Sequence, residues 1–259
     1  MARRTLIIPD IHHKHQIAEQ IIERERPDLT VFLGDYFDDN GDRPEDAGRT
    51  AGWLADSLDS NKHDRIHLIG NHDLHYMTDN RNLLCSGYSD EKKAAIDSYG
   101  IDWGKLRLYC WIGNGGGRWL CTHAGLSNRL FRQQQRQQQR QQQRQQQRLQ
   151  HKTAPATVAD ILQRADADLD SAHNDMIPHP FLEAGYRRGG LPGSIGGLVW
   201  CDYAEFEDIP HTRQIFGHTR GRTVRYGSAA PDSEHYCIDT VLHNYAVYEG
   251  RMAIKSVGR

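Results

Sequence analysis

Five short apolar runs recur along the chain, and they predict strands of a buried β-sheet. Each run is rich in β-branched or aromatic residues and is bounded by glycine or proline, a pattern that is typical of buried strands. The runs lie at residues 5–8, 30–33, 65–69, 119–121 and 214–216.

The segments between the first three runs show helical spacing instead. Ile17 and Ile21 lie on one face of a predicted helix that ends before Pro27. A second helix is predicted over 51–58, after a Gly- and Asp-rich loop at 38–46. This alternation of strands and helices predicts a mainly parallel sheet.

The C-terminal part has a different pattern, with short strand-like runs at 236–238, 245–248 and 252–257 separated by turns. We expect these runs to form a second, antiparallel sheet that packs on the first. The chain is therefore expected to have an α/β fold in which two packed β-sheets are flanked by helices. Its 259 residues are enough for one large domain spanning 1–259.

The segment 132–148 fits neither pattern, because arginine recurs at every fourth position between glutamines. As a helix it would have no apolar face, since a step of four residues drifts by about 40° around the helix axis. We expect a solvated or partly disordered insertion at 132–150, followed by an accessory helical or loop segment at 151–195. In that segment Thr157 and Asp160 have the spacing of a capping box.

Nucleic-acid binding is an alternative function, and 132–148 is the only part of the chain for which we expect such a partner. The repeat lacks the interleaved aromatic residues that stack on bases. The formal net charge of −2 also predicts no general attraction to nucleic acid or to an anionic membrane. A helix predicted at 157–172 carries aspartates that could neutralise the arginines, namely Asp160, Asp166, Asp168 and Asp170.

The cysteines indicate a reducing setting. Five are present without close pairing, and an odd number cannot all be bridged within one chain. This favours a cytoplasmic location. The apolar run after Arg3 and Arg4 stops at Pro9, which is too short for a signal sequence or a membrane span, so no membrane partner is expected.

Residues with metal-ligating side chains follow all five apolar runs. In open α/β sheets, ligands bind at the carboxyl ends of the strands, so we expect these residues to converge there. Any one of them alone would be more typical of a turn or of a hydrogen-bonded histidine, as we expect for His75. Their joint occurrence indicates a functional site. They are Asp10, His12, Asp35, Asn71, His72, His123 and His218.

This set suits two divalent cations. A second cation about 3.5–4 Å from the first needs a bridging carboxylate, and Asp35 is the natural candidate. Asp10 and His12 can reach one ion, and the other would be completed by Asn71, His123 and His218. Oxygen and nitrogen ligands without a thiolate favour manganese, with iron or zinc as alternatives.

In this order the motifs Asp-x-His, Gly-Asp-x-x-Asp, Gly-Asn-His-Asp, His-Ala-Gly and Gly-His-Thr resemble those of the calcineurin-like metallophosphoesterase superfamily. They are most similar to its phosphoprotein phosphatase branch, which includes small phage-type phosphatases and symmetrical diadenosine tetraphosphatases. The stretches 123–127, 198–202 and 237–240 resemble the same branch. The resemblance extends from Asp10 to about Glu249, outside the Arg/Gln insertion, and implies a four-layer α/β/β/α sandwich.

The resemblance also implies a mechanism, in which a metal-bound hydroxide attacks phosphorus and His72 is the general acid, oriented by Asp38. One ion would bind Asp10, His12 and Asp35, and the other would bind Asp35, Asn71, His123 and His218. The implied activity is hydrolysis of a phosphomonoester, on a phosphoprotein or a small molecule. A nucleotide or a dinucleoside polyphosphate is the alternative substrate.

Two positions depart from the superfamily pattern. Arg220 stands where many members have the second histidine of Gly-His-x-His, which is consistent with the phosphatase branch. Asp38 is followed by Asp39 and Asn40, where that branch usually has an arginine that grips the substrate phosphate. Other arginines could replace it, and the candidates are Arg129, Arg187, Arg188 and Arg213.

Overall fold

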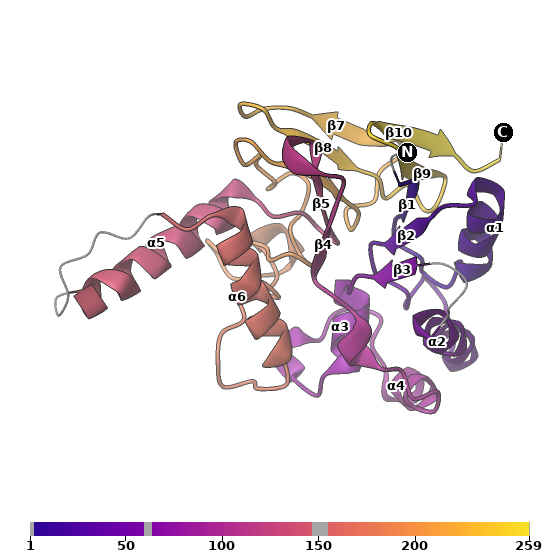
Figure 1. Ribbon diagram of the computed structural model, residues 1–259. Helices are drawn as coiled ribbons and strands as arrows, with labels where there is room; N and C mark the ends of the chain where they lie inside the picture. Colours follow the sequence, from indigo (N-terminus) through magenta and orange to yellow (C-terminus); the bar gives the residue numbers. More distant parts are fainter. Residues whose placement is uncertain (1–2, 60–63, 147–154, 259) are drawn as a thin grey trace.

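The computed structural model describes residues 3–59, 64–146 and 155–258, in which two five-stranded β-sheets pack against each other (Figure 1). The first sheet has the strand order β10-β9-β1-β2-β3. Its central strands β1, β2 and β3 are parallel, as predicted. The strands are β1 (Thr5–Ile8), β2 (Leu29–Phe32), β3 (Asp64–His67), β9 (Asn244–Tyr248) and β10 (Met252–Ser256).

The second sheet is mixed and has the order β4-β5-β6-β8-β7. Its central strands β5, β6 and β8 are parallel, while β4 and β7 pair antiparallel at the two edges. The strands are β4 (Tyr109–Ile112), β5 (Trp119–Thr122), β6 (Arg213–Phe216), β7 (Arg225–Gly227) and β8 (Glu234–Cys237).

The expectation of a single C-terminal antiparallel sheet is wrong. The three C-terminal strands divide between the two sheets: β8 pairs parallel with β6, whereas β9 and β10 extend the first sheet antiparallel to β1. Ile7 of β1 faces Ala246 of β9 in this pairing. The period-two pattern of a strand does not encode its partner, so adjacent strands in sequence can enter different sheets.

Helices cover the outer face of the first sheet and surround the edge where the strands end. The helices are α1 (His15–Glu25), α2 (Pro44–Leu58), α3 (Asn71–Met77), α4 (Asp90–Asp97), α5 (Asn128–Gln146) and α6 (Val158–Asp170), with short 3-10 turns such as η4 (Tyr186–Arg188). Helix α2 begins within the predicted loop at 38–46, because Pro44 favours the first helical position and Asp46 accepts a hydrogen bond from the Arg43 amide. Within the described residues, no helix is both long and apolar enough to span a bilayer.

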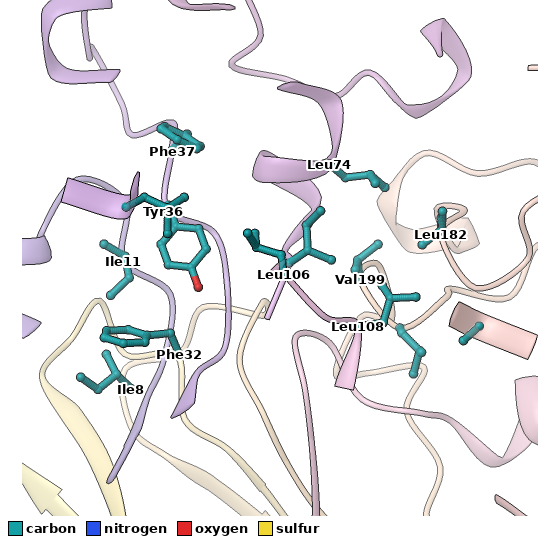
Figure 2. Close-up of a cluster of buried hydrophobic side chains, with 14 of the residues drawn as sticks. Ile8, Ile11, Phe32, Tyr36, Phe37, Leu74, Leu106, Leu108, Leu182 and Val199 are labelled. Atoms are coloured by element: carbon teal, nitrogen blue, oxygen red, sulfur yellow. The ribbon is translucent and has the colours of Figure 1, made fainter. Parts of the chain in front are cut away.

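Alternate residues of the central strands enter two different apolar clusters. Ile7 and Val31 point into the layer between the two sheets, while Ile8 and Phe32 belong to the cluster beneath the helices. Figure 2 shows Ile8 and Phe32 in that second cluster, which continues to Leu74 in the middle of α3. The strands are therefore fixed on both faces, and this holds their carboxyl ends in place.

The described part of the Arg/Gln segment is a helix in which most residues are exposed or half-buried, and the expectation of a solvated or partly disordered insertion stays a prediction. Helix α5 extends away from the body of the molecule in Figure 1. Gln134 is fully buried, and its backbone carbonyl accepts a hydrogen bond of 3.2 Å from the guanidinium of Arg164 in α6. Arg136 and Arg140 are exposed, and the end of the repeat at 147–150, including Arg148, lies outside the described residues.

Three of the four aspartates of α6 have hydrogen-bond partners other than those arginines. Asp160 caps the helix by accepting a hydrogen bond from the Thr157 amide, which confirms the predicted capping box. Asp166 accepts one from Tyr109, and Asp168 accepts one from the Phe181 amide. The segment 151–195, described from residue 155, thus packs as one helix followed by loops and η4.

Candidate metal centre

The structure brings the seven residues predicted from the strand ends, together with Asp38, to one edge of the two sheets. Seven of the eight are buried, His12 and His218 at 8% exposure among them, and His72 is half-buried. A cavity of about 630 Å³ opens beside them and is lined by His12, Asp35, Asp38, Asn71, His72 and His218. The residues come from the ends of β1, β2, β5 and β6 and from the start of α3.

One group of possible ligands consists of Asp10, His12 and Asp35. One donor atom of each lies within 4.8 Å of the others, and His12 Nε2 is 3.8 Å from Asp35 Oδ2. The other ring nitrogen of His12, Nδ1, is 3.0 Å from the carbonyl oxygen of Phe37. A proton on Nδ1 would donate to that carbonyl and leave the Nε2 lone pair directed at the group, as in many metal sites.

A second group consists of Asp35, His123 and His218. His123 Nε2 is 3.4 Å from Asp35 Oδ2, 3.2 Å from Asn71 Oδ1 and 3.2 Å from His218 Nδ1. The Nδ1 atom of His123 is 2.9 Å from the Leu33 carbonyl oxygen, which orients this ring in the same way as that of His12. Asp35 belongs to both groups, so its carboxylate is placed to bridge two ions.

The spacing and chemistry of these donors fit divalent cations. Atoms that bind one ion at about 2.1 Å lie about 3.0–3.4 Å apart in octahedral or tetrahedral geometry, which matches the spacing around His123 Nε2. Burial and the neighbouring carboxylate of Asp239 raise the pKa of Asp10 to about 7. Burial lowers the pKa of His218, so this imidazole is neutral, the form that binds metals. A bound cation would offset the free-energy cost of burying these charged carboxylates away from water.

The backbone at the centre is strained where the side chains must turn toward one another. His12, Asp35, Asp38 and His218 all have positive φ, at 40°, 52°, 59° and 64°. Non-glycine residues rarely adopt this conformation, and such residues cluster at functional sites. The amide of His218 donates to both carboxylate oxygens of Asp10, at 3.0 and 3.1 Å, which joins the ends of β6 and β1.

Glycine is required where the strand ends approach most closely. A Cβ atom at Gly217 would lie 2.0 Å from Asp10 Oδ1, and one at Gly70 would lie 2.1 Å from Asp35 Oδ1. Neither contact is possible without displacing a carboxylate. This explains physically why glycine precedes His218 and Asn71 in the motifs.

Asp38 is the centre of a hydrogen-bonded cluster. Its Oδ2 atom is 3.0 Å from His72 Nδ1 and 2.9 Å from His75 Nε2, while Oδ1 accepts from Tyr76 Oη at 2.7 Å and from Lys92 Nζ at 2.8 Å. Burial alone would raise the pKa of Asp38, but hydrogen bonds from His72, His75 and Lys92 outweigh burial and hold it well below its ordinary value. Burial likewise opposes the charged form of His72, whereas Asp35 and Asp38 raise its pKa to about 11.

Three residues of this cluster were missed by sequence reasoning. His75 was expected to be an ordinary hydrogen-bonded histidine, and it is buried beside the centre with its Nε2 atom 2.9 Å from Asp38 Oδ2. Its position three residues after His72, on the same face of α3, was the available signal. Tyr76 and Lys92 gave no signal, because only the packing of α3 and α4 brings them to Asp38.

Two arginines line the cavity, and only one of them was among the candidates. Arg188 Nε is 2.9 Å from Asp202 Oδ2, and its Nη2 donates to Thr219 Oγ1 at 3.1 Å. Arg220 also lines the cavity and was not among the candidates for phosphate binding. The remaining candidates lie elsewhere, because Arg129 and Arg187 are exposed outside the lining and Arg213 pairs with Glu234 at the opposite end of β6.

Comparison with known proteins agrees with this geometry. Residues 3–222 match the family described as calcineurin-like phosphoesterase. A search of curated proteins gives no match.

Solved structures with the same fold include two phosphatases. The cold-active protein-tyrosine phosphatase of a psychrophilic Shewanella species has 13% sequence identity and a TM-score of 0.50, over 98% of this chain and 80% of that chain. A protein serine/threonine phosphatase from Saccharomyces cerevisiae, with similarity to human phosphatase PP5, has 11% identity and a TM-score of 0.53, over 100% of this chain and 80% of that chain. At such low identity these likenesses establish the fold alone.

Proposed function

The chain belongs to the calcineurin-like phosphoesterase family of metal-dependent hydrolases, and on this premise we propose that it hydrolyses a phosphomonoester. The observation that carries the proposal is the pair of ligand groups sharing Asp35, placed beside His72 and Arg188 in one cavity. Such a cavity combines metal ligands, a general acid and a phosphate-binding cation, the three parts that phosphoryl transfer to water needs.

Two divalent ions would be held by the two groups that meet at Asp35. Asp10, His12 and Asp35 would hold one, and Asp35, Asn71, His123 and His218 would hold the other. When bound, the ions would lower the pKa of a water molecule and neutralise the phosphoryl oxygens. We propose manganese for both positions, because the donors are oxygen and nitrogen atoms without a thiolate.

His72 is proposed as the general acid for the leaving oxygen. The contact of its Nδ1 with Asp38 orients the ring and leaves Nε2 as the nitrogen that can donate a proton. Asp38 is itself fixed by Tyr76 and Lys92, so the acid cannot rotate freely. This is positioning by a rigid polar cluster.

Arg188 is proposed to bind the substrate phosphate in place of the arginine that is absent after Asp38. Its contacts with Asp202 and Thr219 fix the guanidinium at the cavity wall, and Arg220 supplies a second positive charge. Guanidinium groups bind phosphate oxygens in a bidentate manner. The two arginines would therefore select a dianionic phosphate.

The part of the substrate that carries the phosphate group would lie in a second cavity. This cavity, of about 950 Å³, shares Ser86, Arg188 and Trp200 with the first and is also lined by apolar residues such as Ile177 and Leu191. A phosphorylated peptide or small molecule fits this arrangement of an anionic head beside an apolar surface. A nucleotide or dinucleoside polyphosphate is the alternative substrate class.

A direct assay separates these substrates. Metal-stripped protein is supplied with Mn²⁺ and tested on a chromogenic phosphomonoester, the matching diester, a phosphopeptide and a dinucleoside tetraphosphate, beside Asp35→Asn. We expect turnover of the monoester and phosphopeptide that requires metal and is lost in Asp35→Asn. Faster turnover of the tetraphosphate would establish the alternative, and no turnover by folded, metal-loaded protein would contradict the proposal.

Two further points stay predictions. The exposed arginines of α5, among them Arg136 and Arg140, are proposed to bind nucleic acid only weakly. A nucleic-acid affinity that depends steeply on salt, and loses this dependence when 132–148 is deleted, would show a stronger role.

A cytoplasmic location is proposed because all five cysteines are free thiols.

A further inference from the structure

A third cluster of metal-type donors lies next to the proposed centre. It consists of His72, His75 and Cys85, whose donor atoms lie within 4.8 Å of one another. Cys85 Sγ is 3.2 Å from His75 Nδ1 and 3.8 Å from His72 Nδ1. The cluster thus differs from the main centre in containing a thiol.

The spacing suits a tetrahedral ion. A zinc ion binds thiolate sulfur at about 2.3 Å and imidazole nitrogen at about 2.0–2.1 Å, which places the two ligand atoms about 3.6 Å apart. The two observed sulfur–nitrogen distances lie on either side of that value. One thiolate with two imidazoles favours zinc or another thiophilic divalent ion over manganese.

The cluster lies in the wall between the two cavities and is accessible from both sides. His72 lines the first cavity and Cys85 lines the second, while Ser86, the next residue, lines both. Cys85 is half-buried, so an ion can reach its sulfur from solvent. The other thiols are buried in the core, at 0–6% exposure: Cys110, Cys121, Cys201 and Cys237.

We propose that Cys85, His72 and His75 form an inhibitory site for zinc or a similar thiophilic divalent ion. Binding would release the thiol proton of Cys85 and any proton on the Nδ1 atoms of the two histidines, since the ligands must be deprotonated. Metal on His72 Nδ1 takes the place of the contact with Asp38, so the ring loses its orienting partner. Inhibition rests on the proposed role of His72 as the acid, whereas binding of the ion does not.

Cobalt(II) is the probe that reports binding without an activity assay. Cobalt bound by a thiolate gives a sulfur-to-metal charge-transfer absorption in the near ultraviolet, and cobalt in the main centre gives none because its donors are oxygen and nitrogen. We expect this band in the wild-type protein and in the matched control Cys110→Ala. We expect it to be lost in Cys85→Ser and weakened in His75→Gln, with folding checked by thermal unfolding.

Zinc inhibition is then measured on the manganese-loaded proteins, each relative to its own activity before zinc is added. We expect Cys85→Ser to need at least about tenfold more zinc for half inhibition than the wild type or Cys110→Ala. A wild type without the band, or a band that persists in Cys85→Ser, would overturn the site. Equal inhibition of the wild type and Cys85→Ser by zinc would overturn the inhibitory role. If no phosphoester is hydrolysed at all, the cobalt band still tests the site.

Discussion

His72 Nδ1 lies 3.0 Å from Asp38 Oδ2, and this contact joins the start of α3 to the loop after β2. The same carboxylate oxygen lies 2.9 Å from His75 Nε2, while the other oxygen accepts from Tyr76 and Lys92. Asp38 is therefore surrounded by donors on all sides. We propose that its role is to hold His72 in place, so changing it is expected to affect catalysis more than metal content.

Asp38→Asn should reduce kcat by about 10- to 100-fold, because an amide can no longer accept from every donor that fixes His72. His72→Asn should reduce kcat by about 10²- to 10⁴-fold, the usual contribution of a general acid. Metal content, measured by elemental analysis, should stay at the wild-type value in both.

The double variant tests whether the two residues act as one unit. Asp38→Asn combined with His72→Asn should be no slower than His72→Asn alone, since Asp38 acts through the histidine. A further loss equal to that of the single Asp38→Asn change would mean that Asp38 has an independent function.

Gly217→Ala should strongly reduce metal affinity, because the new methyl group occupies the place of Asp10 Oδ1. Gly117→Ala is the matched control, since a Cβ there would meet only Arg213 Nη1 at 3.8 Å. Isothermal titration with Mn²⁺ should show affinity at least about tenfold weaker for Gly217→Ala and unchanged for the control. Equal affinities would show that the ends of β1 and β6 separate easily.

Metal removal should lower the thermal stability of the protein. Ligands that bind only the folded state stabilise it by about 2.7 kcal/mol at a hundredfold excess over Kd, which corresponds to about 5–10 °C in Tm for a chain of this size. Calorimetry with and without Mn²⁺ should show this shift in the wild type and in Asp97→Asn, an exposed carboxylate paired with Lys93. Asp10→Asn should show a much smaller shift, and a full shift there would exclude Asp10 as a ligand.

Glu25→Gln should lower the free energy of unfolding by about 2 kcal/mol at neutral pH. Burial alone would raise the pKa of Glu25, but hydrogen bonds from Lys255, Tyr245 and Arg4 lower it to about 2. The stabilisation by the charged carboxylate is therefore fully present above its ordinary pKa of 4.5 and is lost as the pH falls toward 2.

Denaturant unfolding at several pH values measures this effect. The stability difference between wild type and Glu25→Gln should be constant from pH 8 to about 5 and should shrink below that. A difference that grows as the pH falls would contradict the assignment.

Arg188→Gln should raise KM for a phosphomonoester by about 10- to 100-fold, because a bidentate partner of the phosphate is lost. The neighbouring Arg187→Gln is the control, since that side chain is exposed outside the cavity lining. Steady-state kinetics on both variants would distinguish them, and an unchanged KM in Arg188→Gln would transfer the phosphate-binding role to Arg220.

Much of the first sheet and of the metal-type residues could be predicted from local patterns. The apolar run at 5–8 and the ligand pair Asp10 and His12 are adjacent in sequence, so one motif indicates both the strand and the chemistry at its end. The same holds for Asp35 after β2 and His218 after β6. A ligand residue that directly follows a strand can therefore be predicted from the local sequence.

The features that could not be predicted depend on tertiary pairing. The runs at 245–248 and 252–257 have the pattern of strands, but nothing local places them beside β1 instead of β8. Lys92 reaches Asp38 only because α4 packs beside the site. Gln134 is a polar residue in a polar repeat, and its burial is decided by its contact with α6. In each case the deciding partner is far away in sequence.

The pairing of Ile7 with Ala246 has a consequence for synthesis in the cell. Strand β1 is translated before β9, so the growing chain carries β1, β2 and β3 with an open strand edge until β9 follows. Such edges recruit other strands, and contacts between residues so far apart form slowly. We expect the nascent chain to depend on chaperones until β9 emerges, and the catalytic centre to assemble only after translation of the whole first sheet.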